Sequence, residues 1–127
     1  MNGDPVPDVP MLAGMGGMNS SQYQSAHAGH RAILLSRNDD TGEYESLAST
    51  LGVEIVDKVI QRGKPNPRSY LGSGKLQEIA EEMVMSGPGH LWHRVDLVLI
   101  HDNLKSSQLV NINDALTIET WDRVRLL

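Results

Sequence analysis

The sequence predicts an α/β fold in which a mostly parallel sheet of four strands has helices on its faces. Three observations support this fold class. Apolar runs of strand length alternate with stretches whose apolar residues recur every three or four positions. The segments between them are short, and no sequence repeat is present. Alternating strands and helices with short connections are typical of right-handed parallel units, so we expect the order β-α-β-α-β-α-β.

The first strand is expected at residues 31–36, an almost continuous apolar run of the kind found in strands covered on both faces. A helix follows, because Asp40 and Glu43 have the spacing of a capping box. Gly52 is placed to end that helix in a left-handed conformation. Residues 53–60, rich in β-branched side chains, predict the second strand.

The second helix is expected directly after residue 75, since Leu76, Ile79 and Met83 fall on one helical face. It should end near the glycines and the proline of residues 86–89. A buried third strand is expected at residues 95–100.

The last part of the chain predicts one more helix and one more strand. Asp102 or Asn103 is expected to cap the third helix, because Asx residues are preferred at that position. Residues 117–119 predict a short fourth strand.

The chain divides into three parts by composition. Residues 1–30 are rich in Gly, Pro, Ser, Asn and Met without periodicity, and we expect a disordered or vector-derived tail. Residues 31–120 form the α/β domain. Residues 121–127 start like a helix and end on two apolar residues, so we expect them to be the start of a linker helix in a longer protein.

Composition excludes several classes of protein. The 127 residues carry a formal net charge of -5 and contain no cysteine, which rules out disulfides, thiolate metal sites and cysteine nucleophiles. No apolar run reaches the roughly 18 residues of a membrane span. The first residues contain acids and prolines in place of the features of a signal peptide. We therefore expect a soluble, cytoplasmic protein.

One stretch reverses the sign of the charge, and it predicts an anionic partner. Residues 58–77 contain no acid, and they carry the basic residues Lys58, Arg62, Lys64, Arg68 and Lys75. The second half of the stretch runs through glycines into the second helix, so it should present backbone N–H groups at a positive helix end, which attracts phosphate.

Three interpretations of this stretch remain open. A nucleotide-binding P-loop would align Gly74 and Lys75, but it would place Ser69 where the first glycine belongs and Leu76 where the Mg²⁺-ligating hydroxyl belongs. The second interpretation is a plain structural connection. The third, which we favour, is a phosphate-contacting loop for RNA, because several Lys and Arg side chains match a polyanion.

The prolines of this stretch predict a stiff loop. Pro65 and Pro67 each fix φ and extend the preceding residue, which would pre-order the basic side chains. Tyr70 could stack on a base or pack the loop onto the sheet. The candidate RNA- or phosphate-contacting residues are Arg62, Lys64, Arg68, Tyr70, Gly72, Gly74 and Lys75.

The other polar clusters predict no catalytic or metal site. His90 and His93 flank Trp92, but with Asp96 as the one nearby carboxylate they fall short of a zinc centre, so a surface loop is favoured. We expect Trp92 to anchor its own loop or, alternatively, to be an exposed contact residue. His101 follows the third strand without a nucleophile motif.

The sequence resembles the N-terminal domain of the HflX family of ribosome-associated GTPases. The resemblance rests on Gln61-Arg62, on the run Pro65-Asn-Pro-Arg-Ser-Tyr70, on Leu71-Gly-Ser-Gly-Lys-Leu76, on Ser107-Gln108-Leu109 with Asn111, and on Trp121-Asp-Arg-Val-Arg-Leu-Leu127. It departs from the family pattern at residues 86–94, which are longer than usual, at Ser106 and at His101.

The resemblance implies a four-stranded parallel sheet, followed in the whole protein by a helical hairpin and a GTPase domain. GTP and Mg²⁺ would belong to that domain, and no cofactor is expected in this chain, which is not expected to be an enzyme by itself. The implied partners are the large ribosomal subunit, ribosomal RNA and the GTPase domain in cis, and the implied activity is the splitting or rescue of ribosomes. Two alternatives remain, an autonomous nucleotide-binding domain and a regulatory module packing on the GTPase domain.

Overall fold

The computed structural model describes residues 29–127, so the predicted tail lies outside the described part of the chain except for its last two residues. In chain order, the elements are β1 (Arg31–Ser36), α2 (Gly42–Thr50), β2 (Glu54–Ile60), α3 (Ser73–Val84), β3 (Leu97–Ile100), α4 (Ser106–Leu116), β4 (Glu119–Trp121) and α5 (Arg123–Leu126). The strands form one sheet in the order β2-β1-β3-β4, and all three pairings are parallel. The predicted fold class is confirmed.

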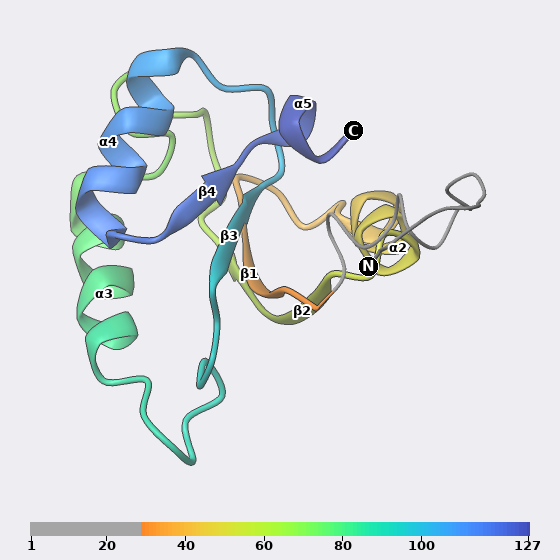
Figure 1. The fold of residues 1–127 in the computed structure, drawn as a ribbon. Helices are drawn as coiled ribbons and strands as arrows, with labels where there is room; N and C mark the ends of the chain where they lie inside the picture. The colour runs from red at the N-terminus through yellow and green to blue at the C-terminus, as the bar shows by residue number, and fades with distance from the viewer. Residues whose placement is uncertain (1–28) are drawn as a thin grey trace, which may run out of the picture.

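Helices cover both faces of the sheet (Figure 1), and an apolar core lies on each face. Helices α3 and α4 lie side by side over one face, where Ile33 and Leu35 of β1 are buried. Ala32 and Leu34, which point to the opposite face, belong to the core beneath α2 and α5. Strand β1 alternates between two buried faces, which explains why its sequence is apolar from Ala32 to Leu35.

Two predicted helix caps are wrong. Helix α2 starts after Thr41, whose Oγ1 donates to Glu45, so Asp40 and Glu43 form no capping box. Helix α4 starts after Lys105, whose backbone N–H donates to the side chain of Gln108 at 2.9 Å. In both helices the N-cap lies later in the chain than predicted. The carboxylate of Asp102 instead accepts from the N–H of the next residue, Asn103, at 2.8 Å.

The predicted left-handed end of α2 is confirmed, since Gly52 has a φ of 87°. The fourth strand lies two residues later than predicted. Thr117 has a φ of 50° and ends α4 in a left-handed conformation, which excludes it from a strand. Trp121 therefore ends β4, and Asp122 caps α5 by accepting from the N–H of Arg125.

Among residues 29–127, none of the helices combines the length and the apolar character that crossing a membrane requires.

Candidate nucleic-acid interface

Residues 61–72, here called the basic loop, leave the carboxyl end of β2 and enter α3. Arg37, which follows β1, holds the first half of the loop. Its guanidinium donates to Gln61 Oε1 at 2.5 Å, to the Lys64 carbonyl at 2.6 Å and to the Gly63 carbonyl at 3.4 Å. Gly63 has a φ of 126°, a conformation that favours glycine. Three acceptors on one rigid guanidinium fix the path of this half of the loop.

The second half of the loop is a tight turn between Asn66 and Tyr70. The two residues exchange both backbone hydrogen bonds, at 2.8 and 2.9 Å. The side chain of Asn66 also accepts from the N–H groups of Arg68 and Ser69. Asn66 therefore organises the turn by itself, as Asx side chains commonly do.

Helix α4 ties this turn to the domain. Gln108 Nε2 donates to the Asn66 carbonyl and Asn111 Nδ2 donates to the Arg68 carbonyl, both at 2.8 Å. In the sequence, Gln108 and Asn111 stand out only through the family resemblance, and Arg37 does not stand out at all. Their partners are backbone carbonyls far along the chain, so residue pattern alone could not reveal these contacts.

Tyr70 is a packing residue, one of the two roles that the sequence left open. Its side chain is 1% exposed and its backbone φ is 67°, a strained value for a residue other than glycine. The phenol oxygen accepts from the Arg37 N–H at 3.2 Å and donates to the His101 carbonyl at 3.4 Å. Burial raises the pKa of Tyr70 to about 12. A ring so deeply buried offers no face on which a base could stack.

The structure divides the predicted basic contacts by their partners. Arg62 donates to Asp39 at 2.7 Å, with both side chains largely exposed, and this guanidinium lowers the pKa of the Asp39 carboxyl. Lys64 and Arg68 are exposed, and within residues 29–127 they form no ion pair with a carboxylate. These two side chains are the most available cations of the loop.

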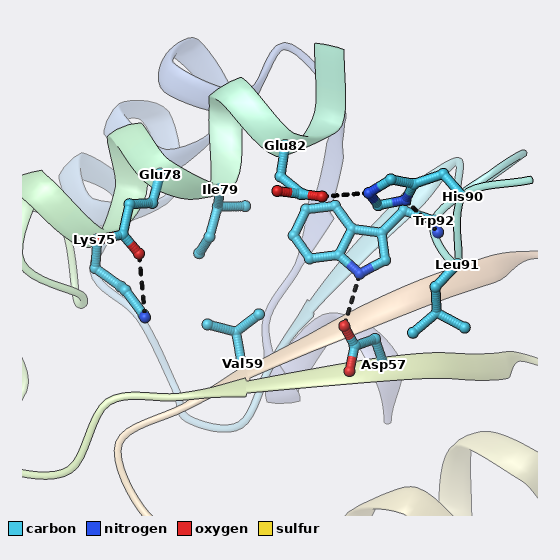
Figure 2. A pocket seen from close by; sticks show the side chains of 9 residues that line it. All are labelled: Asp57, Val59, Lys75, Glu78, Ile79, Glu82, His90, Leu91 and Trp92. Carbon is cyan, nitrogen blue, oxygen red and sulfur yellow. Dashed lines mark hydrogen bonds and ion pairs between the residues drawn. The ribbon is translucent and has the colours of Figure 1, made fainter. Parts of the chain in front are cut away.

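The junction between the basic loop and α3 lacks the groups with which a P-loop holds phosphates and Mg²⁺. The N–H of Gly72 already donates to Gln61 Oε1 at 2.8 Å. Lys75 Nζ lies 3.3 Å from Glu78 and is turned toward it (Figure 2). Leu76, at the position of the metal-ligating hydroxyl, is 5% exposed and belongs to the core. Gly74 has open space around it, so its exposed backbone can be approached closely.

Segment 87–94 is folded against the domain by its aromatic side chain. Trp92 is 5% exposed and its indole N–H donates to Asp57 Oδ2 at 2.7 Å. His90 pairs with Glu82 of α3, as Figure 2 shows, while His93 Nδ1 lies 3.4 Å from the Ser86 carbonyl. Trp92 therefore anchors its own loop. The described residues include no group of three or more His, Asp or Glu arranged to hold a metal ion.

Comparisons with known proteins identify the relatives of this chain. The family described as GTP-binding GTPase N-terminal matches residues 38–127. The GTPase HflX of Caldanaerobacter subterraneus subsp. tengcongensis is 33% identical over 99 residues, which cover 76% of this chain and 22% of that protein. The GTPase HflX of Escherichia coli K12 is 30% identical over 108 residues, which cover 79% of this chain and 24% of that protein. The chain thus spans about a fifth to a quarter of these curated relatives.

A solved structure has a similar fold. The crystal structure of SsGBP in complex with GDP aligns with a TM-score of 0.59 at 20% identity, over 76% of this chain and 27% of that chain. The structure of its G235S variant aligns with the same TM-score at 21% identity. At this identity the likeness shows the fold alone.

Proposed function

This chain belongs to the GTP-binding GTPase N-terminal family, as a domain of the HflX type, and we propose that it is the RNA-contacting domain of a ribosome-associated GTPase. In this proposal the partner is the large ribosomal subunit and its RNA, and the whole protein splits or rescues ribosomes in the cytoplasm. GTP and Mg²⁺ bind to a separate GTPase domain in cis.

The observation that carries the proposal is a pair of exposed cations on a loop that is already ordered. Lys64 and Arg68 extend from backbone whose carbonyls are bound by Arg37 and Asn111. Ordering a flexible loop upon binding costs about 1–2 kcal/mol of conformational free energy per residue. Because this loop is already ordered in the folded protein, binding does not have to supply that free energy. Cations held in register are well suited to the regular phosphates of RNA.

A polymeric anion fits this loop better than a nucleotide does. The first-turn ammonium of α3, Lys75, is paired with Glu78, and no hydroxyl stands where Mg²⁺ would need one. Lys64 and Arg68, by contrast, precede the glycine turn at residues 72–75, which is the part of the chain that would surround a single phosphate group. RNA presents a row of phosphates, so separate cations can each contribute, and the binding depends strongly on salt.

The test is a double substitution, Lys64→Ala with Arg68→Ala, assayed for binding to large ribosomal subunits and to ribosomal RNA. We expect at least a tenfold loss of affinity at moderate salt. The slope of log affinity against log salt should fall by about 1.4, for two lost contacts on single-stranded RNA. The control is the pair Arg94→Ala and Arg125→Ala, which removes the same charge from exposed positions elsewhere. An equal loss in the control would show that only net charge matters and would overturn the assignment.

A second candidate, a regulatory module that packs on the GTPase domain, is favoured by exposed apolar side chains in α5 and directly after it. Val124 is 65% exposed and Leu127 is 78% exposed. Substituting both with Ser should then change the GTPase rate of the whole protein without ribosomes, and an unchanged rate would exclude this role.

A further inference from the structure

A groove lies between β2, α3 and segment 87–94, on the side of the sheet that α3 covers (Figure 2). Its volume is about 360 Å³, and its apolar lining comes from Val59, Ile79 and Trp92. Three carboxylates also line it, those of Asp57, Glu78 and Glu82. We call this feature the acidic groove. The RNA contact proposed for the basic loop does not involve this groove.

The groove carries more negative than positive charge. Lys75 is one cation that lines it, and its Nζ pairs with Glu78. His90 is the other titratable base, and its hydrogen bonds define its tautomer. Nδ1 accepts from the Trp92 backbone N–H at 2.9 Å, so Nε2 carries the proton and donates it to Glu82. Three carboxylates and one ammonium therefore line the groove.

Two of the carboxylates are arranged for a planar cation. Glu78 and Glu82 are four residues apart on α3, so their side chains leave the same face of the helix as neighbours. Both remain half or more exposed, at 70% and 52%. A guanidinium presents five donors in a fixed plane and can bridge two such carboxylates, whereas an ammonium is a single point charge. The methylene stem of an arginine also suits the apolar lining.

The neighbouring edge of the sheet limits how a partner can bind. The N–H of Lys58 in β2 is occupied by the carboxylate of Asp57 at 2.8 Å. The register between β1 and β2 also shifts at Ala32, which interrupts a regular edge. Charges and irregularities of this kind block the addition of another strand. The edge of β2 beside the groove is therefore poorly suited to adding a strand from a partner.

From this geometry we propose that the acidic groove binds an arginine side chain of a basic, partly apolar peptide segment of a protein partner. Leu91 on the groove wall is 57% exposed and supplies an apolar contact for the residue next to the arginine. The occupant follows from charge complementarity together with the apolar lining. The proposal is independent of the RNA contact, which uses the opposite sign of charge.

The test is an NMR titration of the 127-residue chain with an acetylated, amidated peptide of alternating leucine, arginine and alanine. We expect saturable shifts of the Trp92 indole N–H signal, because this group hydrogen-bonds to a groove carboxylate. Replacing arginine by citrulline, its neutral isostere, should weaken binding at least tenfold. Lysine in place of arginine should weaken it about threefold or more.

The protein variants separate the groove from overall charge. Glu78→Gln with Glu82→Gln should weaken peptide binding at least tenfold, while Glu78→Gln alone keeps the His90 contact and should weaken it about threefold. The control, Glu81→Gln with Asp114→Asn, removes two exposed acids that do not line the groove. Equal losses in both double variants, unchanged binding in the first, or equal affinity for the citrulline peptide would each overturn the proposal.

A further variant distinguishes this proposal from the RNA contact. The Lys64→Ala, Arg68→Ala protein should bind the arginine peptide with unchanged affinity, whatever happens to its RNA binding. If peptide binding falls with that variant, the peptide does not occupy the acidic groove and the proposal fails.

Discussion

The basic loop and the acidic groove meet at helix α3 but are held by different interactions. In the basic loop, side chains from elsewhere bind backbone carbonyls, and the loop's own cations Lys64 and Arg68 remain exposed. In the groove, the charged side chains bind one another, as in the pairs of Glu78 with Lys75 and Glu82 with His90. The backbone of the loop is thus held in place while two of its cationic side chains remain unpaired with the carboxylates of residues 29–127. In the groove, a ligand has to compete with the existing ion pairs for the carboxylates.

Lys75 lies at the boundary between these two regions, and its partner decides to which it belongs. The sequence placed it in the basic stretch of residues 58–77, where it follows the Gly-Ser-Gly turn. The structure directs its ammonium to Glu78, on the wall of the groove. Basic residues that are close in the sequence can therefore belong to two different surfaces, because one of them forms an ion pair with an acidic residue one turn along its helix.

The largest expected effect comes from removing the anchor of the basic loop. Tyr70→Ala should lower the free energy of unfolding by about 3–5 kcal/mol, since a buried aromatic side chain leaves a cavity. Urea unfolding measures this loss. The milder Tyr70→Phe keeps the packing and loses the hydrogen bonds of the hydroxyl, for a loss of about 1 kcal/mol. If both variants lost equally little, the ring would not be the anchor.

The next effect tests whether the loop is rigid because of Arg37. Arg37→Met keeps the length of the side chain but removes three donors, so we expect stability to fall by about 1–2 kcal/mol. Amide exchange should accelerate in residues 61–72 while residues 85–96 remain unchanged. Equal acceleration in both segments would contradict the idea that the two regions are held separately.

A smaller effect concerns the first turn of α3. Gly74→Ala introduces a methyl group into open space, so stability should stay the same or rise by up to about 1 kcal/mol. RNA affinity should fall if a phosphate approaches this backbone closely. Thermal unfolding and RNA binding, measured on the same preparation, separate the two effects. Unchanged RNA affinity would restrict the contact to Lys64 and Arg68.

The smallest effect depends on pH and should concern the carboxyl edge of the sheet next to the loop. Burial, helped by Arg123, lowers the pKa of His101 below its ordinary 6.5. The unfolded chain therefore binds this proton more readily, and the stability from neutral His101 should be lost as the pH falls below about 6.5. His101→Asn should remove this part of the pH dependence in urea unfolding. An NMR titration giving a pKa above 6.5 for His101 would contradict the expectation.

The sequence by itself determined the fold class, because hydrophobic periodicity directly reflects which faces are buried. The apolar run at residues 32–35 of β1 needs cover on both faces of the sheet. The stripe of Leu76, Ile79 and Met83 needs cover on one face of the helix. The sequence also located the basic loop. Proline and glycine shape the backbone locally, and the charge of a stretch can be counted from its residues. Helix starts were less predictable, as at Thr41 and Lys105, because several nearby residues could serve as caps.

Only the tertiary structure decided which residues of the basic stretch remain available. That outcome depends on contacts between residues distant in sequence, such as Asn111 with the Arg68 carbonyl and Arg62 with Asp39. It also depends on burial, which removed Tyr70 from the surface. A short stretch of sequence shows neither which distant residues will contact it nor which of its side chains will be buried. The sequence therefore predicted a basic surface, and the packing of β1, α3 and α4 selected Lys64 and Arg68 within it.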